Sequence, residues 1–145
     1  MRKIEEISLG FLGARFQSIK IYLFVYNGHK EEDIIEGRRL TKDALYENYC
    51  GLTSYVNWDN EFSEPRILIF INVDKPGGDQ EIEERLIKDA VPHEISHAVG
   101  KIALRYKLEP GCEILARAQG YATWKFQQAL ERELGYQLVK KEATK

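Results

Sequence analysis

The chain has 145 residues, of which 43% are hydrophobic and 30% charged, and its formal net charge is −2. That length suits one domain with a single core, and the composition is ordinary for a globular protein, so disorder is not the default. Because there is no basic excess and no long block of like charge, nothing favours nucleic-acid binding.

The sequence shows no targeting or membrane-spanning segment. The first residues, MRKIEEISLGFLGARF, lack a continuous apolar run and a small-residue cleavage site, and no other stretch reaches the length that a bilayer requires. We therefore expect a cytoplasmic protein with neither a nucleic-acid nor a membrane partner. The two cysteines, Cys50 and Cys112, do not form a CxxC pair, and we expect two free thiols rather than a disulfide.

Strongly apolar segments dominate the first half of the chain. Residues 19–26, IKIYLFVY, form an almost continuous apolar and aromatic run, as expected of a central strand. Residues 66–73 form a second such run, and the alternating segment 53–58 before it predicts a neighbouring strand. A weak helical stripe runs through residues 1–18, and a clearer one with an acidic start runs through residues 31–49, which predicts a helix packed on the sheet.

Helical patterns predominate in the second half. After a loop rich in Pro and Gly, a helical pattern spans about residues 80–106 and is interrupted at Pro92. Because proline fits the first turn of a helix and kinks a helix elsewhere, either a new helix starts near Val91 or a single helix bends there. A last helix is predicted over residues 112–134, and residues 139–145 form a charged, loose tail.

This order of elements predicts an α+β fold. A small sheet of about three or four strands would carry the two C-terminal helices on one face. We expect residues 1–145 to form one domain, apart from the loose tail.

Residues 93–97, HEISH, form an HExxH motif within the predicted helix. His93 and His97 are four residues apart, so a helix places both imidazoles on one face, one turn apart. Imidazoles in this arrangement bind zinc, and a catalytic zinc keeps about three protein ligands and a water. Glu94 stands beside the pair in the position of a general base. The motif therefore predicts a site for one zinc ion per chain.

The third zinc ligand has to come from outside the motif. Only His29 remains among the histidines, and Ala103 stands where the metzincin pattern requires its third histidine. We favour Glu113, because the residues on its face of the next helix are small and would let that helix lie close. This needs a short first helix or a steep crossing, since in an antiparallel pair a residue near Tyr121 would face His97. Other candidates are Glu109, Cys112, Glu131 and Glu133.

The segment HEISHA, read together with residues 113–121, EILARAQGY, resembles the gluzincin zinc metallopeptidases, in which a glutamate on the following helix is the third ligand. It also resembles small metallopeptidases of phages and prophages, which place a short α/β body before such helices. The specific part covers about residues 92–121, and the spacer between His97 and Glu113 is shorter than in thermolysin-like enzymes. The resemblance implies a zincin-like fold and hydrolysis of peptide bonds in a specific protein substrate.

Peptide hydrolysis also needs a donor for the oxyanion and a place for the substrate. Tyr121 and Arg117 are near enough in sequence to supply the donor. The predicted strand over residues 53–58 can hold an extended substrate at the sheet edge, with Tyr55 and Trp58 lining pockets.

A function of a different class remains open at this stage. The same fold could serve as a binding or assembly module for phage or host proteins, with the metal structural or absent. The intact Glu94 favours the enzyme, since a structural metal site has no use for a carboxylate beside it. The sequence does not indicate the oligomeric state or the substrate.

Overall fold

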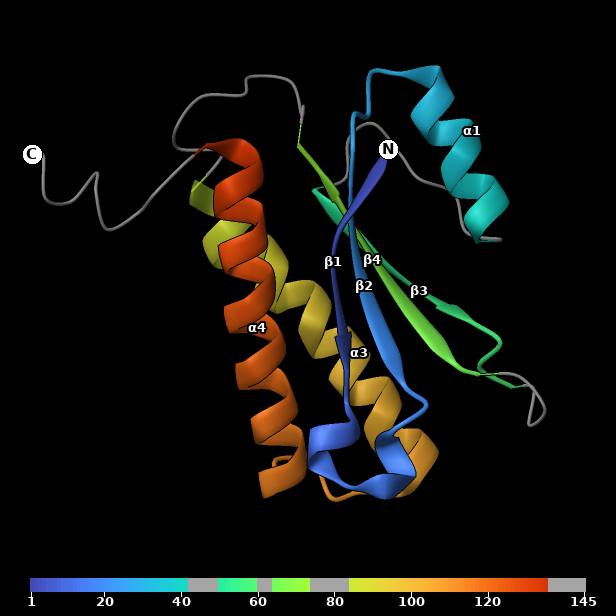
Figure 1. Cartoon of the computed structure of the whole chain (residues 1–145), viewed down its shortest axis with the longest axis vertical. Coiled ribbons are helices and arrows are strands. Elements are labelled where there is room, and N and C mark those ends of the chain that lie inside the picture. Colours follow the sequence, from blue (N-terminus) through green and yellow to red (C-terminus); the bar gives the residue numbers. More distant parts are fainter. Residues whose placement is uncertain (42–49, 60–63, 74–83, 136–145) are drawn as a thin grey trace, which may run out of the picture.

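A computed structural model describes residues 1–41, 50–59, 64–73 and 84–135 of the chain. Its centre is a four-stranded sheet with the strand order β1-β2-β4-β3 (Figure 1). The outer pairs are antiparallel and the central pair is parallel, so the sheet is mixed. The strands are β1 (Arg2–Ser8), β2 (Lys20–Tyr26), β3 (Gly51–Val56) and β4 (Arg66–Asn72).

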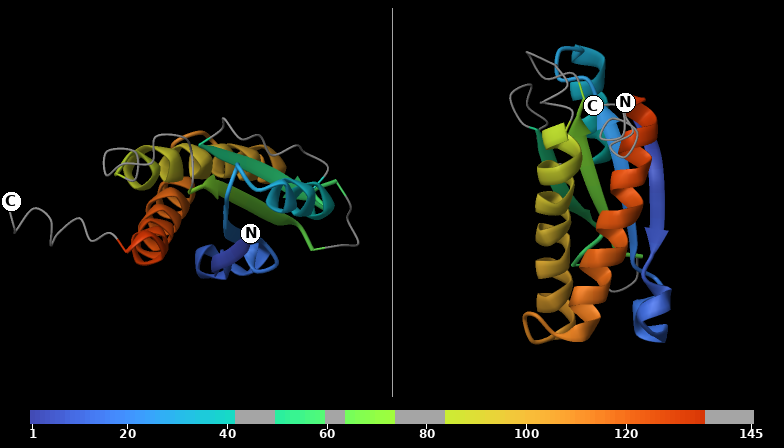
Figure 2. Two further views of the ribbon diagram at one scale, coloured as in Figure 1. Left: turned by 90° about the horizontal axis from the view of Figure 1, so that it is seen from above. Right: turned by 90° about the vertical axis from the view of Figure 1, so that its left-hand side faces the viewer.

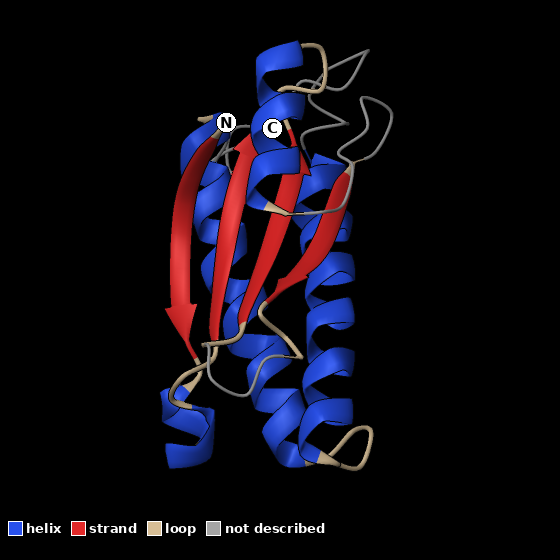
Figure 3. Cartoon of the chain, turned by 90° about the vertical axis from the view of Figure 1, so that its right-hand side faces the viewer, coloured by secondary structure: helices blue, strands red, loops and turns tan. Residues whose placement is uncertain are grey.

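The helices cover the two faces of the sheet unequally (Figure 3). α1 (Glu31–Leu40) lies alone on one face. α3 (Val91–Tyr106) and α4 (Glu113–Leu134) lie on the other face and run antiparallel to each other, as the side view in Figure 2 shows. Two short 3-10 turns, η1 (Gly10–Leu12) and η2 (Ala14–Phe16), connect β1 to β2. The fold is therefore α+β, as the sequence predicts.

Both faces of the central strands are apolar because both faces are covered. Ile21, Leu23 and Val25 of β2 belong to the larger core cluster, which α3 and α4 complete. Tyr22 and Phe24, which alternate with them, belong to a smaller cluster on the side of α1. Burial on two sides explains why this strand is an almost continuous apolar run in the sequence.

The three predicted strands are confirmed, but the helical stripe predicted within residues 1–18 is wrong. Residues 2–8 form β1, which pairs antiparallel with β2 from Arg2 to Ser8 and contributes Ile7 to the core. The ladder of hydrogen bonds with β2 outweighs a weak helical pattern, which Gly10 and Gly13 already interrupt. The helix predicted over 31–49 starts as expected but is too long, since it ends at Leu40 and Thr41 is already extended. Residues 42–49, the start of the helix near 80 and the tail 139–145 lie outside the described residues.

A π-helical turn directly precedes the helix that carries the HExxH motif. This turn, η3 (Leu86–Ala90), continues directly into α3, and Pro92 stands at the N-terminal end of α3. Because proline has no N–H, it cannot donate to the preceding turn, so the predicted interruption falls at this junction. His93 therefore stands in the first turn of α3. Within the described residues, no helix combines the length and the apolarity needed to cross a bilayer.

Candidate metal centre

The structure brings His93 and His97 together on the outward face of α3. Both side chains are exposed, and their Nε2 atoms lie 3.2 Å apart. Two nitrogens that bind one tetrahedral zinc at about 2.0–2.1 Å lie about 3.3–3.4 Å from each other. The observed separation is close to that value, so this pair of imidazoles fits a shared zinc ion.

Glu94 is buried beside the histidine pair, with 7% of its surface exposed. One of its carboxylate oxygens, Oε2, lies 3.9 Å from Nε2 of His93. The other, Oε1, accepts a hydrogen bond from the Thr53 hydroxyl at 2.8 Å, and the same hydroxyl lies 3.0 Å from the backbone carbonyl oxygen of Glu94. A hydroxyl has a single proton, so it serves the two acceptors in turn. One carboxylate oxygen is thereby held by β3, while the other faces the histidines.

β3 can approach Glu94 this closely because residue 51 is a glycine. A Cβ atom at Gly51 would lie 3.0 Å from Cγ of Glu94, 3.2 Å from its Oε2 and 3.2 Å from Cδ1 of Ile71. Contacts of that length are repulsive between carbon atoms, whose optimal separation is about 3.5–4.0 Å. Gly51 therefore provides the room that the buried carboxylate occupies.

Tyr55, further along β3, also contacts the motif. Its hydroxyl donates a hydrogen bond to the backbone carbonyl oxygen of His97 at 3.0 Å. Burial, and secondly the nearby charge of Glu94, raise the pKa of the Tyr55 phenol above its ordinary value. The phenol therefore keeps its proton at neutral pH and remains a donor. Through Thr53 and Tyr55, β3 fixes α3 at two successive turns.

Glu113 is not brought to the histidines. Gln119 of α4 lies opposite the start of the motif, and its Nε2 donates to the Pro92 carbonyl oxygen at 3.4 Å. Glu113 is exposed and stands six residues before Gln119, which corresponds to about 9 Å along a helix axis. In the part of the chain that the structure describes, no group of three or more His, Cys, Asp or Glu side chains could hold a metal ion. α3 continues to Tyr106 and α4 returns antiparallel, which is the arrangement that disfavours Glu113.

Tyr121 lies on another side of α4. Its ring centroid is 4.7 Å from that of Phe11 in η1 and 6.2 Å from that of Trp124. Two residues of helix correspond to about 200° of rotation, so Tyr121 points away from the side on which Gln119 meets α3. The structure therefore does not bring Tyr121 to the metal site. Cys112 is the N-cap residue of α4, and neither Cys50 nor Cys112 is part of a disulfide in the described residues.

No family model, curated protein or solved structure matches this chain. What the site can do chemically is therefore inferred from its own side chains. They provide two convergent imidazoles, a held carboxylate beside them and a strand at the edge of the sheet.

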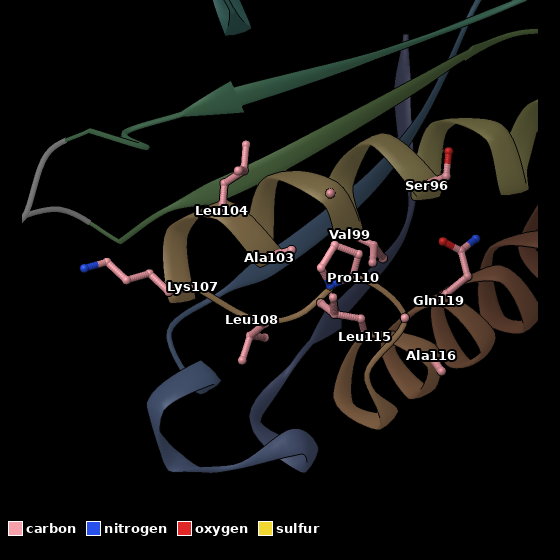
Figure 4. Close-up of a pocket in the computed structure, with 12 residues that line it drawn as sticks. Ser96, Val99, Ala103, Leu104, Lys107, Leu108, Pro110, Leu115, Ala116 and Gln119 are labelled. Atoms are coloured by element: carbon pink, nitrogen blue, oxygen red, sulfur yellow. The ribbon is translucent and has the colours of Figure 1, made fainter.

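An apolar groove between α3 and α4 begins beside the motif. Its volume is about 650 Å³, and Ser96 and Gln119 stand at the end nearest the histidines (Figure 4). Lys107 and Leu108 line the other end, with Pro110 and Leu115 between the two ends, and Leu104 at the rim is 77% exposed. The groove opens on the α4 side of α3, whereas Glu94 and Thr53 meet on the β3 side. The histidine pair thus stands between two different surfaces.

Thr53 and Gly51 are the site residues that the sequence does not reveal. Thr53 is the first residue of the predicted strand and Gly51 lies just before it. That strand is expected to hold the substrate, but no pattern in the sequence shows that either residue meets Glu94. The sequence does show that two basic residues, Lys101 and Arg105, continue the four-residue spacing of the two histidines.

Proposed function

We propose that this protein is a zinc-dependent peptidase with a zincin-like fold, in which His93 and His97 bind the metal. The observation that carries the proposal is the 3.2 Å separation of the two Nε2 atoms, which suits a shared tetrahedral zinc. A zinc ion bound there would make a water acidic enough to ionise near pH 7 and would polarise the carbonyl of a substrate.

Glu94 is the general base in this proposal. Its Oε2 faces the histidines, and its Oε1 is held by Thr53, so the carboxylate has a fixed orientation toward the place where water would react. Glu94 can accept the proton of that water and pass it to the departing amine. Burial within the contact between α3 and β3 keeps the carboxylate from rotating away.

β3 is the element that would bind the substrate. It is one of the two edge strands of the sheet, and it lies directly beside the motif. An extended peptide can pair with such an edge through its backbone, which suits a protein or peptide substrate and brings a peptide bond beside the metal site.

The proposal predicts that Glu94→Gln abolishes hydrolysis but not zinc binding. General acid–base catalysis contributes about 10²–10⁴-fold, so the cleavage rate should fall by at least about a hundredfold. Metal analysis of the purified protein should give about one zinc per chain for both wild type and Glu94→Gln. A variant with His93→Gln and His97→Gln should hold no zinc. If this double variant keeps its zinc, or if Glu94→Gln cleaves as fast as wild type, the proposal fails.

A binding module without catalysis is the second candidate. It is favoured by the position of Glu113, since the described residues supply no third ligand beside the histidines. A module of this kind would lose zinc readily on dialysis and would show no cleavage of any peptide with zinc in excess. Glu113 as the third ligand stays a prediction, and it requires α4 to pack on α3 in a different register.

A further inference from the structure

Lys101 and Arg105 continue the row that the two histidines begin. The residues are spaced i+4 on α3, so each step advances about 6 Å and turns about 40° around the helix. The turn carries the row toward β3. Nζ of Lys101 lies 5.1 Å from the centroid of the Tyr55 ring, and the Arg105 guanidinium lies 5.0 Å from the centroid of the Trp58 ring. The basic row, meaning Lys101 and Arg105, therefore follows β3 beyond the metal site, with Lys101 at Tyr55 within the strand and Arg105 at Trp58, two residues past its end at Val56.

Aromatic rings hold both cations of the basic row in place. Arg105 donates a hydrogen bond to the Trp58 carbonyl oxygen at 2.5 Å, and the aromatic rings hold both heads close to the strand. Among the described residues, no carboxylate lies within ion-pair distance of Lys101 or Arg105. Two positive charges thus stand beside β3 without an acidic partner in that part of the chain.

The backbone of β3 is also oriented for pairing. The Asn72 N–H donates to the Cys50 carbonyl oxygen at 2.9 Å, which makes these residues a hydrogen-bonded pair of the antiparallel ladder. Since such pairs alternate, the N–H and C=O groups of Gly51, Thr53 and Tyr55 point to the outer side of the sheet. A peptide that extends the sheet would bond to these three residues, next to the basic row.

The spacing of alternate residues in an extended peptide matches the spacing of the row on α3. Two residues of an extended strand advance about 6.6–6.8 Å, close to the 6 Å or so between successive members of the row on α3. Alternate side chains of a bound peptide would therefore meet the metal site, Lys101 and Arg105 in turn. We propose that the basic row selects acidic substrates, those with Asp or Glu at the second and fourth positions on one side of the cleaved bond. This inference rests on the proposed function for the cleaved bond, but the preference for acidic peptides is a property of binding alone.

The test measures binding rather than cleavage. Three fluorescein-labelled dodecapeptides alternate Thr with Glu, with Gln or with Lys, and their fluorescence anisotropy is followed with the zinc-loaded Glu94→Gln protein at low ionic strength. We expect the Glu peptide to bind about tenfold more tightly than the Gln peptide, as two partly exposed ion pairs would give. The Lys peptide should bind more weakly than either.

Two matched pairs of substitutions locate the preference. Lys101→Gln with Arg105→Gln keeps the aliphatic stems and should reduce the tenfold preference to less than about twofold. Arg85→Gln with Lys88→Gln removes the same charge from exposed positions before the motif and should leave the preference intact. Lys101→Glu with Arg105→Glu should reverse it toward the Lys peptide. Equal binding of the three peptides, or an equal loss in both Gln pairs, would overturn the inference.

The two proposals can fail separately. If wild type cleaves none of the peptides but the basic row still sets their affinity, hydrolysis is refuted and acidic selection stands. If wild type cleaves the Glu and Gln peptides with equal efficiency and binds them equally, the peptidase stands and acidic selection is refuted.

Discussion

The Thr53 hydroxyl is a single group on which the position of Glu94 depends. Thr53→Val keeps the shape of the side chain but leaves Oε1 of a buried carboxylate without this donor. We expect the free energy of unfolding to fall by about 1–3 kcal/mol, the usual cost of a buried polar group that loses its partner. Urea denaturation at neutral pH, followed by circular dichroism, measures the change.

Thr53→Ser is the control for this prediction. It removes a methyl group but keeps the hydroxyl, so it should retain the hydrogen bond and lose less stability than Thr53→Val. Under the proposed function, Thr53→Ser should also keep more of the cleavage rate. A valine variant as stable and as active as the serine variant would show that the hydroxyl does not hold Glu94.

Local spacing in the sequence is enough to predict that the two histidines of the motif are adjacent. It does not predict which residues from other elements surround them. His93 and His97 are adjacent because the helix repeat makes them so, whatever the rest of the chain does. Thr53 and Gly51 meet Glu94 only because β3 folds against α3, about forty residues later in the sequence. No pattern within a single strand encodes which helix will lie on it.

At the scale of elements, the register of α4 on α3 decides the third ligand. With Gln119 opposite Pro92, Glu113 lies about two turns of helix away from the motif. We expect Glu113→Gln to change the dissociation constant for zinc by less than about threefold, because at that distance Glu113 neither binds the zinc nor supports one of its ligands. Loss of a residue that supports a metal ligand would instead weaken zinc binding by about 10–100-fold. Competition with a chromogenic zinc chelator measures this constant.

His97→Gln provides the reference for that measurement. It removes a ligand of the proposed site, so zinc affinity should fall by more than about a hundredfold. A loss of similar size for Glu113→Gln would restore Glu113 as the third ligand and would mean that α4 shifts along α3 when zinc binds. Cys112→Ser, one residue earlier, tests the other nearby candidate in the same way.

The strands illustrate why some elements are visible in a sequence and others are not. β2 and β4 lie inside the sheet with both faces covered, so their composition alone identifies them. β1 lies at an edge, and of its seven residues only Ile7 is buried. Its charged residues carry no strand pattern, and pairing with β2 is what makes it a strand.

At the scale of the whole molecule, the two faces of the sheet hold different kinds of group. On the side of α3 and α4, Glu94 meets the edge strand β3 and the histidine pair stands on the outward face of α3. The opposite face carries α1, whose buried Asp33 accepts a hydrogen bond from the Asn27 N–H at 2.7 Å and forms an ion pair with the amino group of Met1 at 2.5 Å. These contacts of Asp33 with Asn27 and Met1 tie the start of β1 to α1, and they lie apart from the metal site.

This ion pair makes stability depend on pH. Burial acts to raise the pKa of Asp33, but the hydrogen bonds from the amino group and from Asn27 outweigh it and lower the pKa below its ordinary value of 3.8. A carboxyl group with a lowered pKa in the folded state stabilises the fold above its unfolded pKa, and this contribution is lost as the pH falls through the folded value. Wild type should therefore be more stable than Asp33→Asn at neutral pH, and the difference should shrink below about pH 4.

Urea denaturation of both proteins across pH 2.5 to 7, roughly the range over which a carboxyl with a lowered pKa titrates, measures that difference. Glu32→Gln is the matched control, because it removes an exposed carboxylate from the same turn of α1 and should have little effect at any pH. A gap between wild type and Asp33→Asn that stayed constant into acid would mean that the carboxylate acts through packing rather than charge. A gap that closes, with the Glu32 variant unaffected, would assign the acid sensitivity to the contact between α1 and β1, on the face of the sheet opposite the histidines.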